Sequence, residues 1–104
     1  MTSKQRAYLK GLAMTMEPIA QIGKASLTEE GLAGLEQALE ARELIKIAVL
    51  KNCDDDVRSI AEAIAKHLHA DVVQVIGRRI ILYRPARQAE KRRIELPRSG
   101  KDRE

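Results

Sequence analysis

The chain has 104 residues, which is enough for one domain with one modest hydrophobic core. Hydrophobic residues make up 44% of it, yet no apolar run approaches the length that crosses a bilayer. The first residues also lack the apolar block of a signal peptide. We therefore expect a cytoplasmic protein with no membrane partner, and the single Cys53, which cannot form an internal disulfide, agrees with this.

The net charge of +4 is distributed unevenly along the chain. Residues 1–24 carry a net charge of +3, residues 25–77 carry −5 and residues 78–104 carry +6. Two basic ends around an acidic middle favour an oriented partner with negative charge, nucleic acid first. The alternative is that the basic ends serve solubility alone, because termini are often solvated.

The first predicted element is a helix over residues 3–16, with Ser3 as its N-cap. Its apolar face is formed by Leu9, Leu12, Ala13 and Met16. Three cations, Lys4, Arg6 and Lys10, fall largely on other faces. Arg6 and Lys10 are four residues apart, so their charges repel slightly, and a phosphate partner could relieve this. Two solvated cations are an equally good account.

The next segment combines a strand, a tight loop and the start of a helix. Residues 18–22 are predicted to be a short strand, and Thr28 is the predicted N-cap of the following helix. Between them, Gly23 allows the backbone to turn sharply and Lys24 places a cation at the tip. The free N–H groups of the helix point into the same space, so the combination suits a phosphate. The alternative is a plain strand-to-helix turn with a solvated lysine.

The remaining pattern predicts two helices and three strands. These are a helix at residues 29–41, a strand at 44–50, a helix at 55–69 and strands at 72–76 and 80–83. Gly77 and Arg78 suit a two-residue hairpin turn with glycine first. The strand at 44–50 is apolar on both faces, as in a central strand, except for Lys46. We expect Lys46 to lie toward an edge or to extend its charge to solvent.

The order of these elements predicts an α/β fold of the form α-β-α-β-α-β-β. The first two strands and the helix between them should form a right-handed parallel unit, and the last two strands should pair antiparallel. The result is a single domain with a mixed four-stranded sheet packed with helices. Residues 94–97 can pack on this domain, and we predict residues 98–104 to be a basic, disordered tail.

Motifs for catalysis, nucleotide binding and metal binding are absent from the sequence. A nucleotide P-loop needs glycine and Ser or Thr where this chain has Pro18 and Ala25. The aspartates at 54–56 precede a helix and favour capping over metal binding. His67 and His69 do not face each other on one helix, so they do not form a metal site. We therefore predict no enzyme, no cofactor and no metal.

Aromatic residues are also scarce, with only Tyr8 and Tyr83 in the chain. This disfavours recognition of bases by stacking on a sheet face. Any nucleic-acid binding should depend on phosphate contacts and backbone N–H groups.

Several short motifs occur in order between residues 3 and 97. They are Gln5-Arg6 with Leu9-Lys10, Pro18-Ile19, Gln21-Ile22-Gly23-Lys24, Leu27-Thr28, Arg42-Glu43-Leu44-Ile45-Lys46, Val49-Leu50, Gln74-Val75-Ile76-Gly77, Leu82-Tyr83-Arg84 and the final Ile94 to Pro97. In these motifs the chain resembles the CRM domain family, specifically its small stand-alone bacterial YhbY-like members. On this resemblance, residues 1–97 would be a CRM-like RNA-binding domain.

The resemblance implies a fold similar to the C-terminal domain of translation initiation factor 3. It also implies RNA binding, associated in the bacterial members with precursors of the large ribosomal subunit. It further implies a Gly-x-x-Gly loop, like that of KH domains, which clamps the RNA backbone. Gly23, Lys24 and Ala25 fall on that loop.

Ser26 replaces the second glycine of this loop. Serine avoids positive φ more strongly than glycine does. Either the loop does not need positive φ at this position, or its shape differs from that of the family. The Ser26 hydroxyl could instead donate to a phosphate.

We expect a non-catalytic, monomeric RNA-binding protein that contacts rRNA during assembly of the large ribosomal subunit. The residues predicted to bind RNA are Gly23, Lys24, Ala25, Ser26, Lys4, Arg6, Lys10, Arg78, Arg79 and Arg84. This hypothesis requires the cations to converge on one positive surface beside the loop. The alternatives are a protein-interaction adaptor, whose acidic middle region docks a basic partner, and an unrecognised enzyme.

Overall fold

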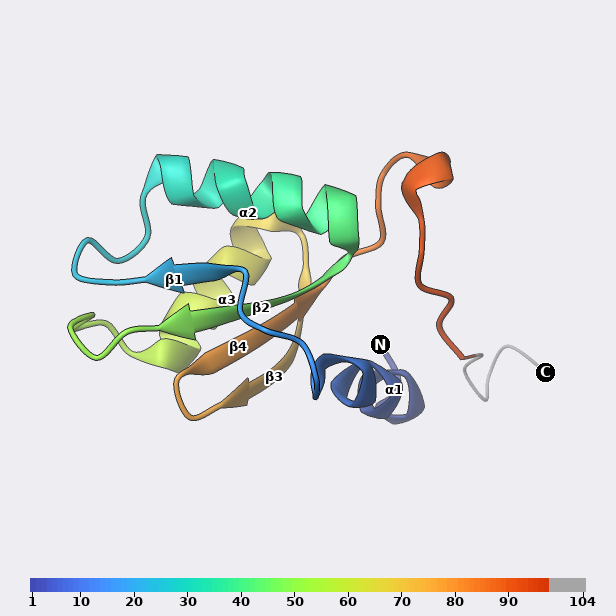
Figure 1. Cartoon of the computed structure of the whole chain (residues 1–104), viewed down its shortest axis with the longest axis horizontal. Coiled ribbons are helices and arrows are strands. Elements are labelled where there is room, and N and C mark those ends of the chain that lie inside the picture. Colours follow the sequence, from blue (N-terminus) through green and yellow to red (C-terminus); the bar gives the residue numbers. More distant parts are fainter. Residues whose placement is uncertain (98–104) are drawn as a thin grey trace.

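A four-stranded sheet with helices on both faces is the centre of the computed structural model, which describes residues 1–97 (Figure 1). The elements in chain order are α1 (Ser3–Ala13), β1 (Ala20–Ile22), α2 (Glu29–Arg42), β2 (Leu44–Val49), α3 (Val57–Leu68), β3 (Asp71–Ile76), β4 (Arg79–Tyr83) and the short 3₁₀ helix η1 (Ala89–Lys91). The predicted order of helices and strands is confirmed.

The strand order across the sheet is β1-β2-β4-β3. β1 pairs with β2 in parallel, and β4 pairs antiparallel with both β2 and β3. The predicted mixed sheet is therefore confirmed, with α2 as the connection between its parallel strands. Of the two residues in the β3–β4 turn, only Gly77 has a positive φ, +57°, as expected for a hairpin turn with glycine first. The similarity to translation initiation factor 3 stays a prediction.

Several predicted ends differ from the structure, and at both ends of α1 the difference comes from local hydrogen bonds. The N-cap of α1 is Thr2 and not Ser3, since the Thr2 hydroxyl accepts from the Gln5 N–H at 3.1 Å. The Gln5 side chain accepts from the Thr2 N–H in return, which completes a capping box. α1 also ends at Ala13, where the Met16 N–H donates to the Ala13 carbonyl and turns the chain toward Pro18.

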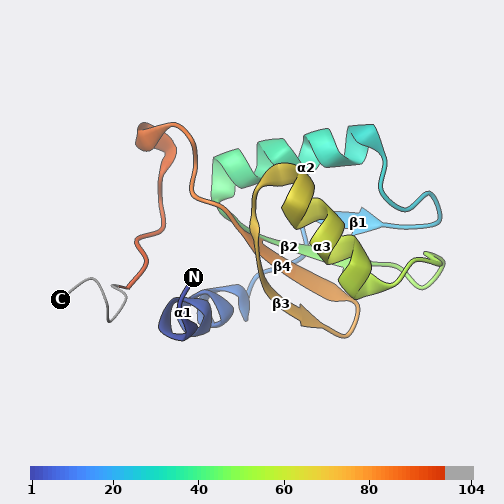
Figure 2. The same ribbon diagram turned by 180° about the vertical axis from the view of Figure 1, so that it is seen from behind.

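The hydrophobic core is split between the two faces of the sheet. α2 and α3 lie on one face, over a core that includes Leu39, Ile47 and Ile64 (Figure 2). α1 lies on the other face, where Leu9 and Ala13 pack against the sheet. Ile45, Ile47 and Val49 of β2 belong to the first core and Leu44 to the second, which explains why β2 is apolar on both sides.

Residues 84–97, here called the C-terminal strap, follow β4 (Figure 1). Ile94 and Leu96 pack against the α1-side core, as predicted for the end of the domain. The predicted disordered tail at residues 98–104 lies outside the described residues. Within residues 1–97, no helix has the length and apolar character to span a bilayer.

Candidate nucleic-acid interface

The Gly-Lys loop, residues 23–26, connects β1 to α2 at one end of the sheet. The Ser26 N–H donates to the Gly23 carbonyl at 2.9 Å, which closes a four-residue turn. Lys24 and Ala25 form the tip of this turn, and both side chains are exposed. The loop therefore presents one cation and exposed backbone to solvent.

We expected Gly23 to allow a sharp turn of the backbone, but the backbone conformation at this position does not require glycine. Gly77 is the glycine with positive φ in the described chain, so Gly23 has a φ that any residue can adopt. A Cβ added at Gly23 would lie 3.4 Å from Asn52 Oδ1 and 3.6 Å from Leu50 Cδ1, which are ordinary contacts. Folding thus tolerates a small side chain here, and a strict need for glycine would come from a ligand that approaches the backbone.

The left-handed conformation is found at Ser26, with φ at +58°. Of the two possibilities left open by the sequence, the one in which the loop avoids positive φ is therefore wrong. The Ser26 hydroxyl donates to the Asp55 carboxylate, in the loop between β2 and α3. The Ser26 hydroxyl therefore links the Gly-Lys loop to the loop between β2 and α3. Its proton is used in this bond and is not directed at a phosphate in solvent.

The start of α2 follows the loop as predicted. Thr28 caps the helix, with its hydroxyl accepting from the Gly31 N–H at 2.9 Å. Glu29 and Glu30 occupy the first turn. Because these carboxylates already complement the helix dipole, the N-terminus of α2 adds less to an anion site than the sequence suggested.

Arg78 lies at the same end of the sheet and holds the β2–α3 loop in place. Its Nε donates to the Val49 carbonyl at 2.9 Å, and its Nη2 donates to the Leu50 carbonyl at 2.6 Å. The side chain is half-buried. Most of its donors are thus used inside the protein, which makes Arg78 a positioning residue for the loops. Arg79, the next residue, is exposed.

The cations of α1 divide into one structural and two exposed residues. Arg6 Nη1 donates to the Val72 and Val73 carbonyls and joins α1 to β3. Lys4 and Lys10 are exposed. Lys4 lies in the first turn of α1, next to Gln5, whose side chain donates to the Pro97 carbonyl at 3.0 Å. Lys4 is therefore beside the C-terminal strap and away from the Gly-Lys loop.

The structure removes Arg84 from the predicted RNA-binding surface. It is 5% exposed and lies at the end of β4 opposite the hairpin turn. Its guanidinium donates from Nη1 and Nη2 to the two carboxylate oxygens of Glu36, both at 2.9 Å, and from Nη1 to the Leu68 carbonyl at 3.1 Å. Arg84 is a buried link between α2, α3 and the strap, so its charge is not available to a ligand.

Lys46 was not among the predicted site residues, and of the two expectations for it, the position toward an edge is wrong, whereas extension of its charge to solvent is compatible with its half-buried side chain. β2 pairs with β1 on one side and β4 on the other, so Lys46 is in an interior strand. Its half-buried side chain lines a groove together with Lys10 of α1. The sequence signal that could have identified Lys46 as a candidate site residue is its position as a cation within an otherwise apolar central strand.

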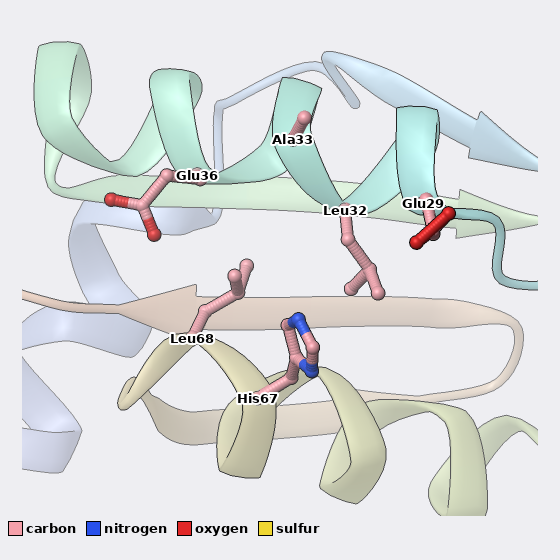
Figure 3. Close-up of a pocket in the computed structure, with 6 residues that line it drawn as sticks. All are labelled: Glu29, Leu32, Ala33, Glu36, His67 and Leu68. Atoms are coloured by element: carbon pink, nitrogen blue, oxygen red, sulfur yellow. The ribbon is translucent and has the colours of Figure 1, made fainter.

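A second concave region lies between α2 and α3 on the opposite face (Figure 3). Figure 3 shows His67 and Leu68 of α3 facing Leu32 of α2, with the carboxylate of Glu36 directed away from them. The hydrogen bond from Arg84 lowers the pKa of Glu36. This carboxylate serves an ion pair within the described fold, and its shifted pKa is no sign of acid–base chemistry.

The ten predicted site residues are therefore not gathered on one surface. The Gly-Lys loop and Arg78 share one end of the sheet, and Arg79 follows directly. Lys10 lies over the sheet, whereas Lys4, Arg6 and Arg84 are placed elsewhere or used internally. The predicted residues that remain exposed are Lys24, Ala25, Arg79, Lys10 and Lys4, of which Lys4 lies apart beside the strap, and half-buried Lys46 lines the groove with Lys10.

Comparisons with known proteins find relatives that match most of this chain. The model of the CRS1 / YhbY (CRM) domain matches residues 1–84. "Probable RNA-binding protein YqeI" of Bacillus subtilis is 41% identical over 97 residues, which cover 93% of this chain and 99% of that protein. An "RNA-binding protein" of Haemophilus influenzae is 40% identical over 98 residues, covering 94% and 96%. The solution structure of the hypothetical protein SAV1595 from Staphylococcus aureus superposes with a TM-score of 0.76 at 41% identity, over 93% of this chain and 99% of that one.

Proposed function

Because this chain belongs to the CRS1 / YhbY (CRM) domain family, we propose that it is a non-catalytic RNA-binding protein that contacts rRNA during assembly of the large ribosomal subunit. Its relatives are named as RNA-binding proteins, and the chain carries a net charge of +4. Within the domain, the Gly-Lys loop is the proposed point of contact with the RNA backbone.

The main observation behind this proposal is that Lys24 is exposed on a loop whose backbone is fixed by hydrogen bonds to other residues. The turn bond from Ser26 to Gly23 and the Ser26–Asp55 hydrogen bond fix the loop without using the Lys24 side chain. A cation carried by a loop with a fixed backbone suits a phosphate, because the backbone does not have to be ordered on binding. Exposed Ala25 leaves room for the RNA backbone to approach.

The test compares Lys24→Glu with the wild type in binding to a labelled fragment of large-subunit rRNA. We expect an affinity loss of about tenfold, since a phosphate contact is replaced by repulsion. Lys66→Glu is the matched control, because Lys66 is an exposed lysine of α3 on the other face. Both variants should keep the wild-type melting temperature, as both sites are on the surface.

Unchanged affinity in Lys24→Glu would remove the loop from the site. Absence of rRNA from the RNA that crosslinks to the protein in cells would leave RNA binding in place and remove the rRNA assignment. The adaptor alternative predicts a different result, namely capture of a basic protein that survives both nuclease treatment and high salt.

A further inference from the structure

The sheet face that carries α1 continues beyond that helix as an open surface. Pairing places Lys46, Ile81 and Gln74 side by side across β2, β4 and β3. Paired residues point to the same face, and Ile81 belongs to the core under α1, so this row faces the α1 side. These three residues form the first of two rows of paired residues on this face of the sheet.

The second row lies two residues further along the strands and so faces the same way. It runs Gln21, Ala48, Arg79, Ile76 across the whole sheet. Gln21 and Arg79 are exposed, and Ile76 is 56% exposed. Figure 1 shows α1 over the other end of the sheet, away from the Gly-Lys loop. Because Gln21 is two residues before Gly23, this row begins next to that loop.

A groove of about 340 Å³ lies where the open surface meets α1. It is lined by Lys10 of α1, by Met14 directly after that helix, and by Lys46, Gln74 and Ile76 of the sheet. The open surface thus runs from the Gly-Lys loop at the β1 edge, across Arg79, into this groove.

The charges on this surface are all positive. Lys10, Lys46 and Arg79 form no ion pair within residues 1–97. Asp71 is on the same face but pairs with Tyr83 at the far end of β3, outside both rows. Three cations with no carboxylate in the same rows favour an anionic ligand. Because they are spaced along the surface, they suit successive phosphates of a nucleic-acid strand.

The other side chains fit the bases of a single strand. Ile76 and the 77% exposed Met14 offer apolar contact to base faces, and the Gln21 and Gln74 amides carry donors and acceptors for base edges. A base pair hides these faces and edges inside the duplex, so a single strand uses this surface better. No aromatic residue lines the groove, so preference among base sequences should be modest.

We propose that a single-stranded segment of the bound RNA passes from the Gly-Lys loop over the open sheet surface into the groove beside α1. Its phosphates contact Arg79, Lys46 and Lys10, and its bases lie against Ile76 and Met14. This inference rests on the proposed function and deepens it, because it assigns binding to Lys46 and specifies the form of the RNA.

The experiment uses a fluorescein-labelled 12-nucleotide single-stranded RNA and the blunt duplex of the same sequence. The double variant Lys46→Gln, Arg79→Gln is compared with Arg58→Gln, Lys66→Gln, which removes one lysine and one arginine exposed on α3. We expect the open-surface variant to bind the single strand about tenfold more weakly. Its slope of log affinity against log salt should be shallower by about 1.4, for two phosphates. The α3 variant should match the wild type in both.

Because Lys46 is half-buried, a second measurement uses the wild-type protein. Amide chemical shifts of Met14, Lys46 and residues 74–79 should move on addition of the single strand, while those of α3 stay in place. This readout does not depend on whether the Lys46 variant folds.

The outcomes separate this inference from the proposed function. If Lys24→Glu weakens binding while the open-surface variant binds like the wild type and the shifts stay within the loop, the inference is overturned and the proposed function stands. Equal affinity for the duplex would overturn the single-stranded path. If the wild type binds neither these RNAs nor the rRNA fragment, both proposals fail.

Discussion

Within residues 1–97, three residues other than glycine have a positive φ, and each lies at the end of a helix or of a loop. They are Ser26 at +58°, Glu43 at +68° and His69 at +56°. At Glu43 and His69 the residue type gave no sign of this conformation, because glycine is the usual occupant, whereas at Ser26 the resemblance had left it open. At Ser26 and Glu43 the side chain itself makes hydrogen bonds that hold the strained backbone in place.

The strain at Ser26 predicts an inverted order of stability between two variants. Ser26→Ala and Ser26→Gly both lose the hydrogen bond to Asp55, but only glycine relieves the positive φ. We expect Ser26→Gly to be more stable than Ser26→Ala by about 1 kcal/mol, measured by urea unfolding. A Gly variant no more stable than the Ala variant would contradict the conformation described for this loop.

The buried position of Arg84 predicts a loss of stability and not of RNA affinity. Arg84→Met leaves the Leu68 carbonyl without its donor and the Glu36 carboxylate with Arg87, at 3.5 Å, as its remaining partner. Because Glu36 keeps some contact with water, we expect a loss of about 2 kcal/mol in chemical unfolding, below the range for fully buried pairs. Arg87→Met, at an exposed arginine that also pairs with Glu36, should change stability by less than about 0.5 kcal/mol.

RNA binding by the folded fraction of Arg84→Met should equal that of the wild type. An RNA affinity that falls while the free energy of unfolding is unchanged would return Arg84 to the binding surface.

At the scale of elements, the C-terminal strap is held to the domain by carboxylates of the α2 region. Glu43, which is 0% exposed, accepts from the N–H groups of Ala86, Arg93 and Ile94 at 2.7, 2.6 and 2.8 Å. Glu40 accepts from two more strap N–H groups. These bonds replace the ladder of a strand, which explains how a segment with little regular structure is held to the domain.

The ionisation of Glu43 makes the strap sensitive to acid. Burial raises the pKa of Glu43, but the three N–H donors and Arg92 outweigh it, so its pKa is below the ordinary value of 4.5. A lowered pKa in the folded state means that the unfolded chain takes up the proton first as the pH falls. The stability from Glu43 is therefore complete above about pH 4.5 and is lost as the pH falls through the folded-state pKa.

We expect Glu43→Gln to be less stable by about 2 kcal/mol at pH 7, since an amide cannot accept all three bonds as a carboxylate does. Its free energy of unfolding should also change less between pH 7 and pH 3.5 than that of the wild type. Glu62→Gln, at an exposed glutamate of α3, is the control and should keep the wild-type pH dependence. Parallel pH profiles for Glu43→Gln and wild type would rule out this role.

At the scale of the whole molecule, the two faces of the sheet differ in the charges that they carry. α2 and α3 cover one face of the sheet (Figure 2), and the acidic character of this face comes from α2, which has four glutamates and one arginine. α1, from the basic N-terminal region, lies on the other face, where Lys10, Lys46 and Arg79 are also found. An anionic polymer would therefore be drawn to one side of the molecule.

This asymmetry predicts the salt dependence of RNA binding. If about five phosphates are neutralised, log affinity should fall against log salt with a slope near −3.5 for a single strand. The slope can be measured by fluorescence anisotropy over several salt concentrations. Binding that does not depend on salt would count against phosphate contacts as the basis of affinity.

Local pattern along the chain was sufficient for the order of helices and strands, the mixed sheet, the Thr28 cap and the Gly77 turn. Periodicity and capping act over a few residues, so they can be followed in the sequence without the fold. The availability of each cation required the tertiary structure, because its partners lie far away in the chain. Arg84 meets a carboxylate 48 residues away, and Arg78 donates to a carbonyl 29 residues away. Conversely, Lys46 has its place on the open surface because β4, β3 and α1 assemble around it.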